Sequence, residues 1–108
     1  MGSTPEGRIQ ANIQKELRKL GVFVFKVHGS ALMPAGLPDL IACVDGAFLG
    51  LEVKTPQTID NVSAKQAHMH DQIRKAGGVC VVVCTVDEAV SAVEGMRASM
   101  RASHKKKA

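Results

Sequence analysis

Gly-Leu-Pro-Asp-Leu-Ile-Ala-Cys-Val-Asp-Gly-Ala-Phe-Leu-Gly-Leu-Glu-Val-Lys is the sequence of residues 36–54, in which two apolar runs lie on either side of Asp45-Gly46. An Asp-Gly pair between such runs favours a two-residue turn with positive φ at both residues. The strand register that follows from this turn places Asp39 opposite Glu52. The stretch therefore predicts a β-hairpin with two carboxylates side by side on one face.

The opposite face of this hairpin is expected to be core. Side chains alternate in direction along a strand, so every second residue of each strand points to the same face. The residues of this face are all apolar: Leu40, Ala42, Val44, Ala47, Leu49, Leu51 and Val53.

A positive charge is needed to offset the repulsion between the two carboxylates. Like charges directly opposite in a sheet are destabilising, since their Cβ atoms lie about 4.5 to 5.5 Å apart. A hard cation such as Mg²⁺ takes oxygen ligands from one or two carboxylates, keeps several waters and accepts substrate phosphate. Lys54 returns to the carboxylate face beside Glu52, and the Val53 carbonyl can project toward the same end of the strand. The hairpin therefore predicts a metal site with a lysine that can orient or activate a water.

Pro38-Asp39, twelve intervening residues and Glu52-Val53-Lys54 resemble the PD-(D/E)XK nuclease motif, and Gly36 and Thr55 resemble its virus-type replication-repair nuclease (VRR-NUC) branch. The resemblance implies that Asp39, Glu52 and the Val53 carbonyl bind Mg²⁺ or Mn²⁺. It implies that Lys54 assists the attacking water. It also implies a core in the order helix, three strands, helix, strand.

The rest of the sequence follows this order and adds one final helix. Thr4 and Pro5 suit the start of the first helix, Gly21 suits its end, and Asp87 is expected to cap the last helix. The expected fold is α/β and restriction-endonuclease-like, a mixed four-stranded sheet flanked by helices in the order α-β-β-β-α-β-α. We assign residues 4–101 to the nuclease-like domain and 102–108 to a basic tail. Helices are expected over 5–20, 63–76 and from 87, and strands over 22–27, 40–44, 47–53 and 79–86.

Glu6 has two interpretations. The dipole of the first helix favours an acidic residue in its first turn. However, Glu6 lies three residues before Ile9, on the apolar stripe of the helix, where a carboxylate needs a partner. The resembled family has a glutamate on its first helix, so Glu6 is also a candidate third acidic group at the metal site.

Gln66 also has two interpretations. Ser63-Ala64-Lys65-Gln66 is a capping box, with serine at the N-cap and glutamine three residues on. In the resembled family a glutamine near the start of this helix borders the active site, and Lys65-Gln66 matches that place. His70 shares a helical face with Gln66, whereas His68 points elsewhere, so the two histidines are not expected to bind one metal.

The loop after the first strand is the candidate DNA contact. Lys26, His28 and Ser30 precede Asp39 in a Gly- and Pro-containing segment, and such loops often carry functional residues. Lys65 is a further candidate. A solvated residue at a strand end accounts equally well for His28. The three cysteines, Cys43, Cys80 and Cys84, lie in apolar runs and are expected to be reduced core residues.

The composition of the 108 residues fits one small domain with a polyanionic partner. The net charge is +4 and the pI is about 9.2, although much of the excess lies near residues 101–107. With no Trp or Tyr and three Phe, the chain lacks an evident platform for stacking unpaired bases. Duplex or branched DNA is the expected partner. The apolar runs are too short to cross a membrane, so we expect an intracellular protein without membrane contact.

The resemblance implies a metal-dependent DNA endonuclease that hydrolyses phosphodiester bonds. Small stand-alone members of this branch look like Holliday-junction resolvases, which implies selectivity for branched DNA, a homodimer and a role in DNA repair. A phage-encoded protein in a bacterial host is compatible with the virus-type branch. The alternative is a noncatalytic DNA-binding module that keeps the nuclease fold. An enzyme acting on another phosphate compound is less favoured, because no Gly-rich phosphate loop is present.

Overall fold

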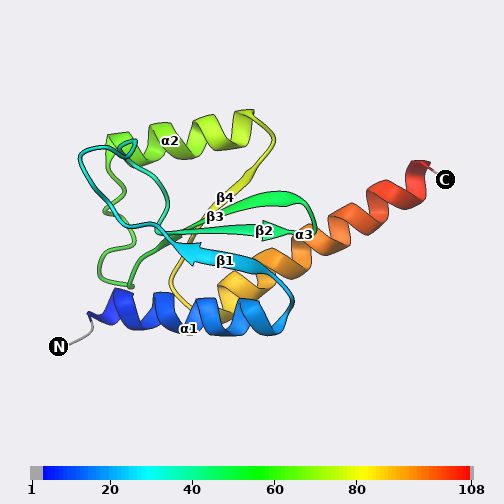
Figure 1. Cartoon of the computed structure of the whole chain (residues 1–108), viewed down its shortest axis with the longest axis horizontal. Helices are drawn as coiled ribbons and strands as arrows, with labels where there is room; N and C mark the ends of the chain where they lie inside the picture. Colours follow the sequence, from blue (N-terminus) through cyan, green and yellow to red (C-terminus); the bar gives the residue numbers. More distant parts are fainter. Residues whose placement is uncertain (1–3, 108) are drawn as a thin grey trace.

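Within residues 4–107 the chain forms three helices and four strands, in the order expected from the sequence (Figure 1). The computed structural model describes residues 4–107, and side chains as far as residue 103. The elements are α1 (Pro5–Lys19), β1 (Phe23–Lys26), β2 (Leu40–Val44), β3 (Ala47–Val53), α2 (Ala64–Lys75), β4 (Val79–Val83) and α3 (Val86–Lys107).

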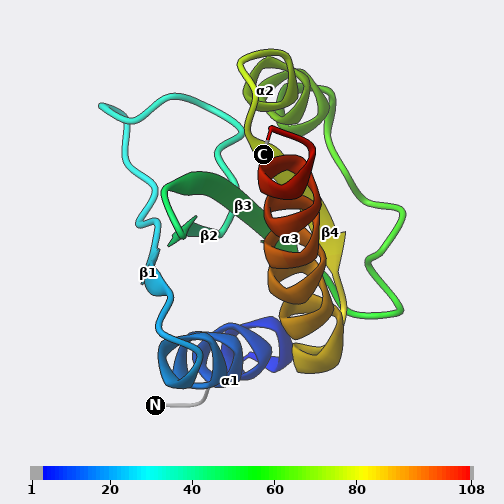
Figure 2. The same ribbon diagram turned by 90° about the vertical axis from the view of Figure 1, so that its right-hand side faces the viewer.

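The strands form one mixed sheet in the order β1-β2-β3-β4. The first three strands are antiparallel, and β4 pairs in parallel with β3. A parallel pair requires a crossover connection, which α2 supplies. Figures 1 and 2 show α2 on one side of the sheet and α1 with α3 on the other. The predicted restriction-endonuclease-like arrangement is confirmed.

The hairpin has the predicted turn and register. Asp45 has φ 51° and Gly46 has φ 91°, as a turn with two positive φ angles requires. Val44 pairs with Ala47, which sets the rest of the ladder. The Arg97 guanidinium of α3 binds both carboxylate oxygens of Asp45, at 2.9 and 3.2 Å. This ion pair holds α3 against the hairpin tip.

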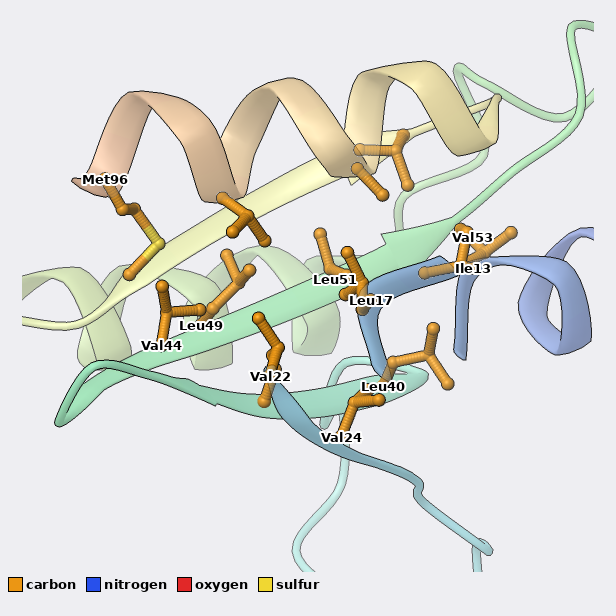
Figure 3. Packing of buried hydrophobic residues seen from close by; sticks show 14 residues of the cluster. Ile13, Leu17, Val22, Val24, Leu40, Val44, Leu49, Leu51, Val53 and Met96 are labelled. Carbon is orange, nitrogen blue, oxygen red and sulfur yellow. The ribbon is translucent and has the colours of Figure 1, made fainter. Parts of the chain in front are cut away.

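The core lies between the sheet and the pair α1 and α3. Figure 3 shows Ile13 and Leu17 of α1 and Met96 of α3 directed toward the same side of the sheet. The expected core face of the hairpin is buried, except that Ala47 at the turn is partly exposed. The buried cluster comprises Ile13, Leu17, Val22, Val24, Leu40, Ala42, Val44, Leu49, Leu51, Val53, Val83, Ala89, Val93 and Met96.

The helix ends confirm most of the capping predictions. The Thr4 side chain accepts a hydrogen bond from the Gly7 N–H, and Gly21 has φ 78° after α1. The prediction for α3 was wrong, because Thr85 rather than Asp87 caps it. The Glu88 N–H donates to Thr85 Oγ1 at 3.1 Å and the Thr85 N–H donates to Glu88 Oε1 at 3.0 Å, a capping box that starts two residues earlier.

Helix α3 continues through most of the segment expected to be a basic tail. It ends at Lys107, and in Figure 1 its last turns project beyond the sheet. Residue 108 and the side chains of residues 104–107 lie outside the described part of the chain. None of the helices within residues 4–107 is long and apolar enough to span a membrane.

Part of the sheet face that carries α2 is uncovered. Helix α2 packs over β4 and reaches Glu52 on β3, whereas the same face of β1 and β2 is open. Phe23, Phe25 and Cys43 are exposed there, as is Phe48 on β3. The prediction that Cys43 is a core residue was therefore wrong, because it alternates onto this open face. Cys80 is buried as expected.

Candidate active site

The end of the hairpin brings Asp39 and Glu52 together. Leu40 pairs with Leu51, so Asp39 and Glu52 occupy the next opposing positions. Asp39 Oδ2 accepts a hydrogen bond of 2.8 Å from the Val53 N–H, which ties this carboxylate to β3. Glu52 is only 2% exposed and lies on the sheet face that α2 covers. The turn register thus produces the predicted pair of carboxylates.

The environment of Glu52 disfavours its charged form. Burial and then the negative charge of Asp39 raise the pKa of Glu52 to about 7, against the opposing effect of Lys54. Glu52 Oε1 is buried and has no hydrogen-bond partner among the described residues. A buried carboxylate oxygen without a partner is costly. Glu52 therefore needs a proton or a cation.

Lys54 lies on the same face as Glu52 and is nearly buried. Its Nζ atom is 3.6 Å from Glu52 Oε2 and donates a 3.1 Å hydrogen bond to the Asn61 carbonyl. Asn61 belongs to the loop between β3 and α2. This loop therefore folds back over the lysine and holds its ammonium group beside Glu52.

Gln66 makes the predicted capping contact and also reaches Glu52, because its amide has an acceptor and a donor end; its role in catalysis stays a prediction. Gln66 Oε1 accepts from the Ser63 N–H at 2.9 Å and completes the capping box. Gln66 Nε2 donates to Glu52 Oε2 at 3.0 Å. One side chain caps α2 and orients the buried carboxylate.

His70 also faces Glu52, and the sequence analysis did not place it in the site. It lies one turn after Gln66, is 2% exposed, and its Nε2 atom is 3.7 Å from Glu52 Oε1. Burial and then the positive charge of Arg74 lower the pKa of His70 below its usual value. The four-residue spacing from Gln66 could have revealed it, since such residues are neighbours on a helix.

Glu6 reaches the loop beside the site. Its Oε2 atom accepts a 2.8 Å hydrogen bond from Thr58 Oγ1, which in turn accepts from the Thr55 N–H at 2.8 Å. Among the described side chains, those of residues 4–103, no three His, Cys, Asp or Glu are grouped so that they could hold a metal. The expected three-carboxylate cluster is therefore not formed, and the role of Glu6 stays a prediction. Gln10, one turn later, is buried and its Oε1 has no partner among described residues, which was not foreseen.

Two small residues explain how the chain positions Asp39. Gly36 has φ 83°, and a Cβ atom there would lie 2.3 Å from the Lys65 carbonyl oxygen at the start of α2. A Cβ on Gly50 of β3 would lie 2.7 Å from Pro38 Cγ. The segment before Asp39 thus docks against both α2 and β3, and these contacts leave no room for side chains at either glycine.

The predicted DNA contacts lie on the surface. Lys26, His28, Ser30 and Lys65 are all exposed, and Ser30 Oγ accepts a 3.2 Å bond from the Leu32 N–H. In Figure 1 the β1–β2 loop, the β3–α2 loop and the start of α1 lie at the same end of the molecule. The candidate contacts therefore surround the end where the carboxylates lie.

Comparisons with known proteins support a shared fold over most of the chain. No protein-family model matches the sequence, and no curated protein matches it significantly. A solved structure described as a VRR_NUC domain matches with a TM-score of 0.69 and 28% identity, over 85% of this chain and 97% of the other. The Archaeoglobus fulgidus Holliday junction resolvase Hjc, from an archaeal hyperthermophile, matches with a TM-score of 0.56 and 25% identity, over 72% of this chain and 65% of that one. The likeness therefore covers the arrangement of elements and not only a short motif.

Proposed function

The chain has the VRR-NUC fold of the PD-(D/E)XK nucleases, and on this basis we propose that it is a divalent-metal-dependent DNA endonuclease. The observation that carries the proposal is the contact of Glu52 with Asp39, Lys54 and Gln66 at the end of the hairpin. A binding module gains nothing from two adjacent carboxylates that repel DNA phosphates. Hydrolysis of a phosphodiester uses both of them.

A divalent metal fits the residues present. Glu52 has a buried oxygen without a partner and a pKa raised to about 7. Asp39 adds a second carboxylate next to it. We assign Mg²⁺ or Mn²⁺ to Asp39, Glu52 and the Val53 carbonyl, with Glu6 as a further candidate, because Mg²⁺ is commonly held by one or two carboxylates plus water and phosphate. When bound, the metal polarises the phosphate and lowers the pKa of its water.

The other side chains orient the reacting groups. Lys54 is held from two sides, by Glu52 and by the Asn61 carbonyl, so its ammonium has a defined direction. It donates to the attacking water and stabilises the charge that develops on the phosphate. Gln66 keeps the Glu52 carboxylate in one orientation through its Nε2 atom.

Branched DNA is the substrate class that we propose, with Holliday junctions as the leading example. The net charge of +4 and the exposed Lys26, His28, Ser30 and Lys65 suit phosphate contacts, which position a protein on DNA without reading sequence. The similarity to the resolvase Hjc supports selectivity for branched structure.

The open face of β1 and β2 is the surface that we assign to a second copy of the chain. Phe23, Phe25 and Phe48 form an exposed apolar patch there. In a symmetric dimer, the patch of each copy would pack against the other copy and be removed from water. The dimer would also provide two active sites, one for each of two DNA strands. Light scattering should therefore show a dimer at micromolar concentration, and Phe25→Lys should shift it to monomer. A wild-type monomer with and without DNA contradicts paired cutting.

The test of the proposed activity is a cleavage assay on linear, flapped and four-way DNA with Mg²⁺ or Mn²⁺. Wild type should cleave, and Glu52→Gln should bind the DNA without cleaving it. Glu16→Gln is the matched control, because Glu16 is a partly exposed residue of α1 that pairs with Lys19 and lies on the opposite side of the sheet from Glu52. If wild type binds all three DNAs and cleaves none with either metal, the noncatalytic binding module is the correct function.

A further inference from the structure

The loop between β1 and β2 carries an exposed apolar tip. Leu32 is 95% exposed and Met33 is 43% exposed. Single exposed apolar residues are ordinary, but an adjacent pair at the end of a projecting loop is a candidate contact. In Figures 1 and 2 this loop stands clear of the sheet.

The loop has internal contacts that hold its tip in place. At its base the Val27 N–H donates to the Asp39 carbonyl at 2.9 Å. At its tip Ser30 accepts twice, through Oγ from the Leu32 N–H at 3.2 Å and through its carbonyl from the Met33 N–H at 3.1 Å. The tip is therefore presented at a defined position relative to Asp39.

A cavity lies within the same loop and reaches the candidate active site. Its volume is about 440 Å³, and Gly29, Ser30, Met33 and Asp39 are among the residues that line it. This volume is in the range of small-ligand pockets, about 300 to 1,000 Å³. The lining is formed mostly by glycine, proline and small or apolar side chains, so the cavity has room for a nucleobase without an aromatic stacking partner.

We propose that the β1–β2 loop opens DNA at a branch point, with Leu32 inserted between base pairs and the cavity receiving the base that is released. Proteins that kink DNA insert apolar side chains, Leu and Met among them, between base steps. Unpairing costs least where pairing is already interrupted, which favours a branch over a continuous duplex. The inference rests on the proposed nuclease function and names the residues that recognise the branch.

Positive charge borders the loop on both arms. Lys26 ends β1 directly before the loop, Lys65 lies where Gly36 docks against α2, and His28 adds an exposed imidazole within the loop. Phosphates on either side of an opened step would meet these side chains. The base of the loop ends at Asp39, so the loop that opens the step and the carboxylates lie at the same end of the molecule.

The first test measures base unstacking without catalysis. A four-way junction carries 2-aminopurine at the branch point or, as a control, in the middle of one arm, and binding is followed in EDTA. Wild type should raise the fluorescence of the branch probe only. Leu32→Ser should lose most of this increase, whereas Leu32→Met, which keeps an apolar wedge, should retain it. Since Leu32 is almost fully exposed, neither change should alter stability.

A second variant tests the cavity. Gly29 lines it, and a Cβ added there meets no atom within 4 Å, so Gly29→Leu adds side-chain volume at the cavity lining without a clash at Cβ. This variant should also lose the fluorescence increase while the affinity for unbranched duplex is unchanged. An increase equal to that of wild type in both Leu32→Ser and Gly29→Leu overturns the proposal.

The third test uses cleavage and rescue. Leu32→Ser should cut the fully paired junction about tenfold more slowly than wild type, since unstacking costs a few kcal/mol per step. Two mismatched pairs at the branch should restore its rate, because the step is already open. If the mismatches do not restore the cleavage rate of Leu32→Ser, the proposed insertion of Leu32 is wrong, and the nuclease function is unaffected. If wild type does not cleave, the nuclease function is refuted. The fluorescence measurement in EDTA still shows whether Leu32 unstacks the bases at the branch.

Discussion

The stability of the metal-free protein should depend on the protonation of Glu52. Burial and the charge of Asp39 raise the pKa of Glu52 from 4.5 to about 7 in the folded chain. The folded state therefore binds the proton more tightly than the unfolded state does. The resulting stabilisation is fully present below about pH 4.5 and is lost as the pH rises through about 7. At 1.36 kcal/mol per pH unit, the loss attributable to Glu52 is ~3 kcal/mol.

The assay is urea unfolding in EDTA, measured for wild type and Glu52→Gln at several pH values between about pH 5 and pH 8. Other titrating groups contribute to both proteins, so the difference in unfolding free energy isolates Glu52. This difference should fall by ~3 kcal/mol across the range. Excess Mg²⁺ should reduce the fall, because a cation at the site favours the charged carboxylate.

The refuting result is a constant difference between the two proteins over the whole range. It would mean that the folded environment does not hold the proton on Glu52. Glu16→Gln serves as the control, since Glu16 lies on α1, on the side of the sheet opposite Glu52.

Three further changes separate the roles of the neighbouring residues. Gln66→Glu keeps the oxygen that caps α2 but places a second carboxylate next to Glu52. Helix content should therefore persist while the cleavage rate falls, and an unchanged cleavage rate would contradict the role of Gln66 in orienting Glu52. Lys54→Ala should lose cleavage but still bind DNA in an anisotropy assay, since one phosphate contact among several contributes modestly to affinity. Equal losses in DNA affinity and in cleavage rate would indicate a purely electrostatic role for Lys54. Glu6→Gln can still accept the hydrogen bond from Thr58, so its melting temperature without metal should be unchanged or higher while metal-dependent cleavage weakens. A loss of about 0.3 to 1 kcal/mol with full cleavage would instead identify Glu6 as a helix-dipole residue.

Local patterns predicted the parts of the site that lie on adjacent strands. The Asp45-Gly46 turn and the alternation of apolar residues were enough to set the register, and the register placed Asp39 opposite Glu52. The capping box at Ser63 was equally readable, because its partners are three residues apart. Asp87 was a wrong prediction of the cap, because the Thr-x-x-Glu pattern of Thr85 and Glu88 starts the helix two residues earlier.

Contacts between distant elements could not be read in the same way. The hydrogen bond from Gln66 to Glu52 joins residues on α2 and β3, and it exists because the crossover helix packs over that part of the sheet. His70 was known to share a face with Gln66, but the direction of that face depends on the packing. The contact between Glu6 and Thr58 spans 52 positions of sequence.

The sequence by itself determined the order of elements, the hairpin register and the positions of the two carboxylates and the lysine, because turn chemistry and side-chain alternation act over a few residues. Only the tertiary structure decided that Glu52 is buried, that Gln66 and His70 face it, and that the apolar tip of the β1–β2 loop is exposed. These properties depend on which surfaces the helices cover. Burial removes water from a carboxylate and so changes its pKa, an effect that no local pattern encodes.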